Sequence, residues 1–345
     1  MPDYGILMYP SYNRVYFQSS KGLALSELQA AGRKLSQACL DIHHKDIGGV
    51  NYIAFSTREP LNESDIQVLS RLSFVYALFI LEGQDSPVLH PVMLDSGAVF
   101  EDDLVTILKY SGKTNETFTK LLVNIGWLLC DSIKDERVHL LDPVCGRGTT
   151  LFQGMIYGFD VSGIELDKIH VEQAVNFLAK YLKTKRYKHK MTKSKMSENG
   201  KKLCEITRFE TAGTKEDFKA GKALQVNFYR GDTLHTDKFI KKHSVDIIAG
   251  DLPYGVQHGS STRTGSFTRN PEILIGEALP HWHKVLKTGS SIVLSWNTFV
   301  LKKEQIADLL KTSGFEVQTG EPWDNGFVHR VDQAIIRDII AARKI

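Results

Sequence analysis

The feature of this sequence that most constrains its fold is a series of short apolar segments, each ending in an acidic residue or in glycines. Strands that alternate with helices in this way form a mostly parallel sheet covered on both faces, and ligands bind at the carboxyl ends of its strands. One acid at such a place is usually a helix cap, but four in order along one edge predict a ligand site. The four segments end at Asp142-Pro143-Val144-Cys145-Gly146-Arg147-Gly148-Thr149-Thr150, at Glu165, at Gly231-Asp232 and at Asp251-Leu252-Pro253-Tyr254-Gly255.

The glycine loop after the first strand disfavours two common nucleotide cofactors. Its glycines let the backbone turn tightly, and the helix predicted from Leu151 offers free N–H groups at its start. Position 151 is leucine, so the third glycine of the dinucleotide fingerprint is absent, and no Gly-Lys-Ser/Thr follows for a triphosphate. An acid at 165 is instead placed to accept hydrogen bonds from ribose hydroxyls, and Asp232 to accept one from an adenine amine.

The order Asp-Pro-x-Cys-Gly-x-Gly-Thr, then an acid, then Asp, then Asp-x-Pro-Tyr resembles the class I S-adenosylmethionine-dependent methyltransferases that modify exocyclic amines. It is most similar to the RNA guanine-N2 methyltransferases, namely the THUMP-associated tRNA enzymes and the RlmKL-like methylase domain of bacterial rRNA enzymes. Lys113–Thr119 also resembles the tRNA-type members. The resemblance covers about residues 105–345. It implies an α/β fold, a Rossmann-like doubly wound sheet with a small N-terminal α+β domain, and S-adenosylmethionine as cofactor.

The resemblance also assigns cofactor-binding residues. Glu165 would hold the ribose and Asp232 the adenine. Lys113–Thr119 would close over the methionine end, although Thr114-Asn115 fits a helix N-cap equally well. The methionine and ribose part would be lined by Asp142, Cys145, Gly146, Gly148 and Thr149.

The fourth strand end carries the expected catalytic residues, Asp251, Leu252, Pro253 and Tyr254. An amine conjugated to a base ring is a poor nucleophile because its lone pair is delocalised. Hydrogen bonds from the amine to Asp251 and to a backbone carbonyl at Leu252 or Pro253 would localise that pair, and Asp251 would then take the proton. Tyr254 would stack on a base removed from its helix. The alternative is an ordinary turn after a strand; the family form is more often Asp-Pro-Pro-Tyr, so Leu252 is a departure.

Charge is concentrated in one segment of the chain. Lys183 to Lys202 holds nine basic residues and one acid, a net charge of +8, whereas the whole chain has +3 and the rest therefore −5. Such a segment is either a solvated, flexible stretch or an arm that binds phosphates. Its Lys-rich composition predicts a mobile segment without a core.

The chain of 345 residues is long enough for two domains. We expect an α+β domain at 1–100 that helps to recognise RNA, a connector at 101–112, and a methyltransferase domain at 113–345 with a basic insertion at 183–222. Within the first domain, the residue pattern predicts strands at 4–9, 14–17, 50–56 and 74–81, and helices at 24–40 and 62–71.

The composition of the chain excludes some classes of protein and leaves others open. The apolar run Leu72–Leu81 is about half a membrane span, so no membrane association is expected. Four scattered cysteines without a Cys-x-x-Cys pair suggest neither disulfides nor a metal site and favour the cytoplasm. The expected partner is RNA, with tRNA the first choice, and a protein partner subunit stays open. The alternatives are a DNA amine methyltransferase (adenine N6 or cytosine N4) and a non-catalytic partner protein with a methylase fold.

Overall fold

The computed structural model describes residues 1–9, 14–83, 87–110, 112–133, 137–252, 260–261, 267–268 and 271–345. The chain divides into two compact units. The first comprises Met1–Gly97 and Thr319–Arg337, and the second comprises Ala98–Gln318 and Asp338–Ile345. The first unit therefore includes a late segment that the sequence-based division places in the methyltransferase domain. None of the helices described here is long and apolar enough to cross a membrane.

The first unit is built on a five-stranded antiparallel sheet with the order β2-β3-β1-β4-β5. Its late segment contributes β16 (His329–Arg330), which packs against α1. The Ser26 hydroxyl of α1 donates a hydrogen bond to the Gly326 carbonyl at 2.7 Å. The other elements are β1 (Asp3–Met8), α1 (Arg14–Ala31), β2 (Leu40–Ile47), β3 (Val50–Ser56), α2 (Glu63–Arg71), β4 (Val75–Glu82) and β5 (Val88–Val92).

Four expectations for the first unit are confirmed and two are wrong. The strands at 4–9 and 74–81 are present as β1 and β4. The strand at 50–56 is present, and α2 begins after Asn62, which forms a capping box with Asp65. The strand expected at 14–17 is instead the start of α1, because helical packing of later residues such as Leu28 overrides a local preference for strands. The helix expected to reach residue 40 ends at Ala31. Turns and irregular backbone occupy 32–39, and residue 40 begins β2, which pairs with β3 through a two-residue turn whose glycines both have positive φ.

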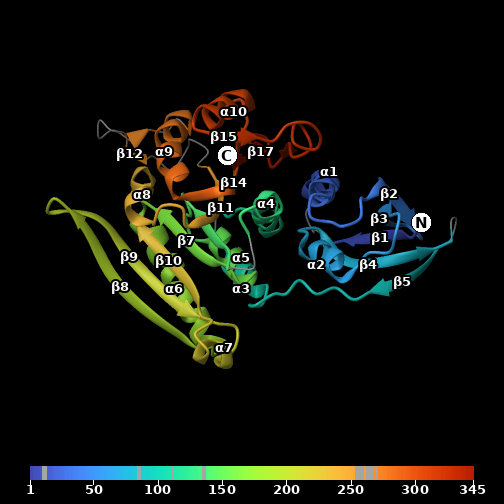
Figure 1. Ribbon diagram of the computed structural model, residues 1–345, viewed down its shortest axis with the longest axis horizontal. Coiled ribbons are helices and arrows are strands. Elements are labelled where there is room, and N and C mark those ends of the chain that lie inside the picture. The colour runs from blue at the N-terminus through green and yellow to red at the C-terminus, as the bar shows by residue number, and fades with distance from the viewer. Residues whose placement is uncertain are drawn as a thin grey trace. The chain divides into compact units, whose positions relative to one another are not determined.

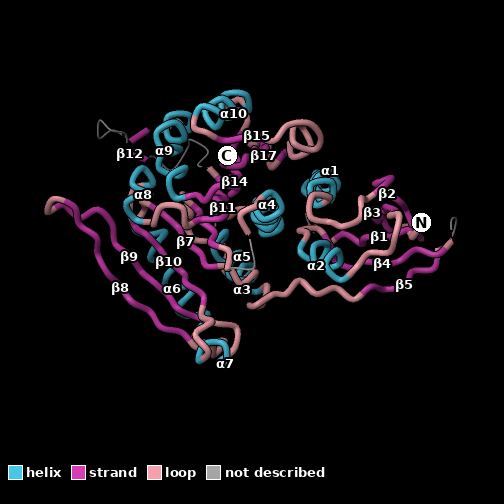
Figure 2. The backbone as a smooth tube through the Cα atoms, viewed as in Figure 1, coloured by secondary structure: helices cyan, strands magenta, loops and turns pink. Residues whose placement is uncertain are grey.

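The second unit is built on a mixed sheet whose path is β15-β17-β14-β11-β6-β7-β10-β9-β8, and β16 of the late segment pairs with β17 at Ile336 and Arg337 as the tenth strand. Figure 2 shows its strands between two sets of helices. Its strands are β6 (His139–Asp142), β7 (Asp160–Glu165), β8 (His189–Glu198), β9 (Lys201–Thr211), β10 (Leu224–Arg230), β11 (Val245–Asp251), β14 (Leu286–Asn297), β15 (Phe315–Val317) and β17 (Ile336–Lys344), and a separate pair is formed by β12 (Ser260–Ser261) and β13 (Phe267–Thr268).

Helices cover both faces of this sheet, as expected for a doubly wound fold. On one face, Phe152 of α5 contacts Phe177 of α6, and α4 packs against α5. On the other, α9 packs against α8, α10 and β14. The helices are α3 (Asp103–Thr106), α4 (Glu116–Leu129), α5 (Thr149–Ile156), α6 (Lys168–Thr184), α7 (Lys215–Lys219), η1 (Thr233–His235), α8 (Thr236–Phe239), α9 (Pro271–Val285) and α10 (Lys303–Thr312).

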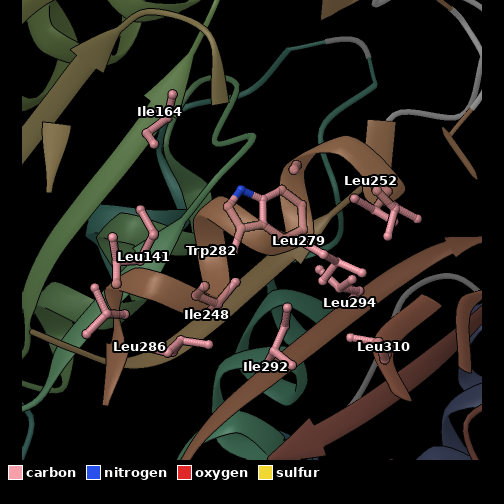
Figure 3. Packing of buried hydrophobic residues seen from close by; sticks show 14 of the residues in the cluster. Leu141, Ile164, Ile248, Leu252, Leu279, Trp282, Leu286, Ile292, Leu294 and Leu310 are labelled. Atoms are coloured by element: carbon pink, nitrogen blue, oxygen red, sulfur yellow. The ribbon is translucent and has the colours of Figure 1, made fainter. Parts of the chain in front are cut away.

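The core on the α9 face holds the central strands in place. Trp282 and Leu279 of α9 pack with Ile248 of β11 and Leu294 of β14, all fully buried (Figure 3). Leu252, directly after β11, is 1% exposed and belongs to the same cluster. This packing fixes the carboxyl end of β11, where the expected catalytic residues begin.

The basic segment does not lack a core, which corrects the expectation drawn from its composition. Its strands β8 and β9 form an antiparallel hairpin that extends the sheet beyond β10 (Figure 1). Cys204, Ile206 and Phe209 of β9 are buried. The turn is Asn199-Gly200, with φ values of 51° and 76°. This dipeptide is a strong hairpin signal because both positions of a two-residue type I′ turn require positive φ.

Candidate active site

The expected site residues meet at one place because of the strand order. β6 is central, with β7 and β10 following on one side and β11 and β14 on the other. All of these pairings are parallel. The carboxyl ends of β6 and β11 therefore flank the point at which the chain reverses its direction of winding, where ligands bind in such sheets.

The glycine loop after β6 is held against β7. Gly146 and Gly148 have φ values of 51° and 85°, which favour glycine. The Cys145 N–H donates to the Ile164 carbonyl at 2.9 Å. A Cβ on Gly163 of β7 would lie 2.6 Å from Cys145 Sγ and 2.5 Å from Leu151 Cδ1. The loop can therefore approach β7 only because residue 163 has no side chain. Cys145 is 7% exposed, and burial raises the pKa of its thiol well above the usual range.

Asp142 is the buried acid of the site, 3% exposed at the end of β6. Its Oδ1 accepts a hydrogen bond from the Val144 N–H at 3.0 Å. Burial above all raises the pKa of Asp142 from 3.8 to about 7. The negative charges of Asp251 and Glu165 act in the same direction, while the hydrogen bonds from Val144 and Thr150 oppose them. A positively charged group of a ligand would therefore be stabilised here and would favour the ionised carboxylate.

Glu165 and Asp232 lie at the ends of adjacent strands and are oriented by backbone donors. Glu165 accepts from the Gly146 N–H at 2.9 Å through Oε2 and from the Asp167 N–H at 2.7 Å through Oε1. Asp232 Oδ1 accepts from the Leu234 N–H at 3.0 Å. The Gly231 N–H donates to the Glu165 carbonyl at 3.1 Å and links the two strand ends. A carboxylate oxygen can accept more than one hydrogen bond, so these backbone contacts do not by themselves exclude contact with a ligand.

The Asp251 carboxylate accepts hydrogen bonds from two hydroxyl groups that belong to other elements. Thr114 Oγ1, just before α4, donates to Asp251 Oδ2 at 2.6 Å, and Ser295 Oγ of β14 donates to Oδ1. Ser295 is opposite Asp251 in the parallel β11–β14 pair, and its carbonyl accepts from the Leu252 N–H at 2.8 Å. Pro253 and Tyr254 lie outside the described residues, as does most of the polar loop that follows them.

The segment before α4 contains the helix N-cap that the sequence offered as one of two alternatives. Asn115 is the N-cap of α4, and its side chain accepts from the Thr117 and Phe118 N–H groups at 2.9 and 3.2 Å. Thr114 instead faces Asp251. Lys113 donates to the Val105 carbonyl and to Glu116, both at 2.5 Å. The segment is therefore fixed beside the end of β11.

Five residues near the site make contacts that were not expected from the sequence. Thr114 and Ser295 contact Asp251, and the side chain of Thr150 bonds to Asp142. The Tyr110 hydroxyl lies 3.1 Å from Thr149 Oγ1, and the Arg147 guanidinium lies 4.2 Å from the centre of the Tyr110 ring. Of these, Thr114, Arg147 and Thr150 carried a signal, because they stand within the recognised motifs.

The described residues fit S-adenosylmethionine. A buried carboxyl with a raised pKa suits a ligand with positive charges, and the glycine loop leaves backbone room beside it. Two further carboxylates at adjacent strand ends suit hydroxyl and amine donors. The fit therefore follows from the chemistry of the groups assembled at this edge.

Comparison with known proteins gives a family. Residues 115–304, more than half of the chain, match the model of the RMKL-like methyltransferase domain. No curated protein matches the sequence. Among solved structures, TrmN from Thermus thermophilus is 11% identical with a TM-score of 0.44, covering 100% of both chains.

Two further structures are similar at the same low level. The rRNA methyltransferase AviRa from Streptomyces viridochromogenes is 14% identical with a TM-score of 0.39, covering 73% of this chain and 94% of that one. A TehB-like SAM-dependent methyltransferase from Corynebacterium glutamicum is 15% identical with a TM-score of 0.36, covering 62% and 84%. Such scores carry no argument about function, so the assignment rests on the family match and agrees with the sheet order and the motifs. The chain belongs to the RMKL-like methyltransferase domain family and is an S-adenosylmethionine-dependent methyltransferase.

Proposed function

We propose that the enzyme methylates the exocyclic N2 amine of a guanine in RNA, with tRNA as the first candidate substrate. The observation that carries the proposal is Asp251, a carboxylate at the carboxyl end of β11 held by the hydroxyls of Thr114 and Ser295. The tRNA assignment is supported by the resemblance of Lys113–Thr119 to tRNA-type enzymes. The base is supported by Asp rather than Asn at position 251.

The proposed cofactor contacts follow the geometry of the strand ends. Asp142 would pair with the positively charged methionine end, and the loop from Cys145 to Thr149 would surround it. Glu165, whose two oxygens are already oriented by backbone N–H groups, would accept from the ribose hydroxyls. Asp232 would accept from the adenine amine. Lys113–Thr119 would cover the methionine end.

Methyl transfer requires that the acceptor nitrogen be aligned with the methyl donor and that this nitrogen have an available lone pair. The cofactor supplies a methyl group on a positively charged sulfur, which is already activated for in-line displacement. Asp251 would accept a hydrogen bond from the guanine amine and take the proton that the nitrogen loses on methylation. The donors Thr114 and Ser295 keep this carboxylate in one orientation. The carbonyls of Leu252 or Pro253 would accept the second N–H, and Tyr254 would stack on the base.

The burial of Leu252 is compatible with its proposed function. Its side chain packs into the core beside α9, and its N–H donates a hydrogen bond to the Ser295 carbonyl. Only its carbonyl would be used in catalysis. A leucine at this position of the motif therefore anchors the catalytic segment without altering the groups that the reaction needs.

The test is methyl transfer from radiolabelled cofactor to unmodified tRNA, rRNA and genomic DNA, followed by nucleoside analysis. We expect label in N2-methylguanosine from tRNA. Asp251→Ala should lower the rate constant by about 10²- to 10⁴-fold, the usual contribution of a general base, with cofactor affinity unchanged. Asp308→Ala, which removes an exposed acid of α10, is the matched control and should be fully active. Label only in DNA, or full activity of Asp251→Ala, would overturn the proposal.

A further inference from the structure

The β8–β9 hairpin presents lysines that form no salt bridge within the described part of the chain, although Lys195 lies opposite Glu205 and Lys201 opposite Glu198 in the strand register. Lys190, Lys193, Lys195 and Lys201 are exposed and form no salt bridge with any residue that the structure describes. Nearby lysines differ: Lys202 pairs with Glu205 at 3.0 Å, and Lys185 pairs with Asp103 at 2.5 Å. Because the unpaired lysines sit on strands rather than on a loose segment, their positions are set by the sheet.

The register of the hairpin brings its basic tip to the edge that holds the active site. Glu205 of β9 is opposite Arg230, the last residue of β10, and Arg230 is opposite Glu165 of β7. β9 runs antiparallel to β10, so Lys201 lies four residues beyond the sheet edge, roughly 13 Å at about 3.3 Å per residue. The tip therefore extends past the carboxyl ends of the strands on which Glu165 and Asp232 are placed (Figure 1).

A cavity lies between α6 and the hairpin, next to Arg230, where β9 begins to extend beyond the end of β10. Its volume is about 310 Å³, near the lower end of the range for small-ligand sites, roughly 300 to 1,000 Å³. Val171 and Val175 of α6 give it an apolar wall. The rest of the lining consists of the apolar Ile206, the cations Lys193, Lys195 and Arg230, and the polar side chains of Glu172, Asn176, Ser194, Glu205 and Thr207. None of the residues assigned above to the cofactor or to methyl transfer is among them.

We propose that the hairpin and this cavity bind the RNA strand beside the active site. The cavity takes one unstacked nucleotide, with its base against Val171 and Val175 and its polar edge facing Asn176. Lys193, Lys195 and Lys201 contact the adjoining phosphates. An apolar wall with polar groups suits a base, and unpaired cations leading to the active-site edge suit a polyanion. The proposal rests on an RNA substrate, as proposed above, and assigns where that RNA is held.

The charge part is tested with the full-length enzyme and a fluorescently labelled, unmodified tRNA transcript at several salt concentrations. Replacing Lys193, Lys195 and Lys201 by Gln should lower the slope of log K against log salt by about 2, since each phosphate contact contributes about 0.7 to 0.9. The matched control replaces Lys215, Lys219 and Lys222, exposed lysines at the amino-terminal end of β10, and should leave the slope unchanged. Equal slopes for the two triple variants would overturn the proposal. It would also be overturned if the Lys193, Lys195 and Lys201 variant lost affinity for polyglutamate, an acidic peptide, but kept its affinity for tRNA.

The cavity part is tested by filling it. Asn176→Trp places an indole at an exposed position that lines the cavity, whereas Gln173→Trp does so at an exposed position of α6 outside the lining. Asn176→Trp should raise the KM for tRNA about tenfold, with unchanged affinity for S-adenosylhomocysteine, and Gln173→Trp should not. Equal KM values would overturn the nucleotide site. If the wild-type enzyme binds tRNA but transfers no methyl to guanine N2, the proposed function fails while the binding comparison can still be made.

Discussion

The carboxyl edge of β6 and β11 differs from the β8–β9 hairpin in the burial and hydrogen bonding of its charged side chains. At the edge, carboxylates are partly or fully buried, and each accepts hydrogen bonds from backbone or hydroxyl donors. On the hairpin, lysines are exposed, and several form no salt bridge with the described residues. The first arrangement fixes atoms in space and raises the pKa of Asp142, whereas the second leaves charges available without fixing the side chains. The contrast separates a site that positions small groups from a surface that attracts a large anion.

The same contrast predicts different sensitivities. Changes at the edge should alter cofactor binding or chemistry at any salt concentration, because buried interactions are poorly screened. Changes on the hairpin should alter RNA binding in a salt-dependent way and leave the cofactor site intact. A single substitution that changed both cofactor affinity and the salt dependence of RNA binding would contradict this distinction.

The largest effect outside the catalytic acid is expected at Gly163. In Gly163→Ala, the new Cβ would meet Cys145 Sγ at 2.6 Å and Leu151 Cδ1 at 2.5 Å, so the glycine loop must move. Overpacking of this kind costs about 1–3 kcal/mol, and a loss of that size in cofactor binding corresponds to roughly 5- to 150-fold. Calorimetric titration with S-adenosylhomocysteine measures it. Gly276→Ala in α9, whose Cβ would meet Leu309 Cδ2 at an ordinary 3.7 Å, should bind normally. Equal affinities would show that the loop does not depend on its packing against β7.

An intermediate effect is expected from the pH dependence of Asp142. Its pKa is raised from 3.8 to about 7, so the native carboxyl holds a proton that the unfolded chain releases from about pH 4. The contribution of this group to stability therefore falls as the pH rises from about 4 to 7. A ligand cation requires the ionised form, so affinity for S-adenosylhomocysteine should weaken by up to about tenfold per unit below pH 7 and level off above it. Titrations in buffers of different ionisation enthalpy measure the proton released on binding. Asp142→Asn should abolish this dependence, and a pH-independent wild-type affinity would contradict the assignment.

The sequence predicts the parts of the site whose residues adjoin a strand end. Asp142, Glu165, Asp232 and Asp251 each follow an apolar segment directly, so the parallel sheet brings them to one edge. Ser295 was not found because it meets Asp251 only through strand pairing across 44 residues, and a serine in a buried strand carries no signal of its own. The hairpin was missed for another reason. Its lysines suggested disorder, whereas its turn dipeptide and the buried side chains of β9 determine the structure.

The smallest effect is expected at the hairpin turn, and it separates the order of the hairpin from its charge. Gly200 has a φ of 76°, so Gly200→Val forces a β-branched residue into the left-handed region at a cost of about 1–2 kcal/mol. No charge is lost, so the salt slope of tRNA binding should stay near the wild-type value while the affinity falls a few-fold. Amide hydrogen exchange of residues 201–205 should become faster, and cofactor affinity should not change. Asn199→Gly, which suits the same turn, is the control and should behave as wild type. Faster exchange with wild-type RNA affinity would mean that the lysines act through charge alone, and the positions that the sheet gives them would then not matter for binding.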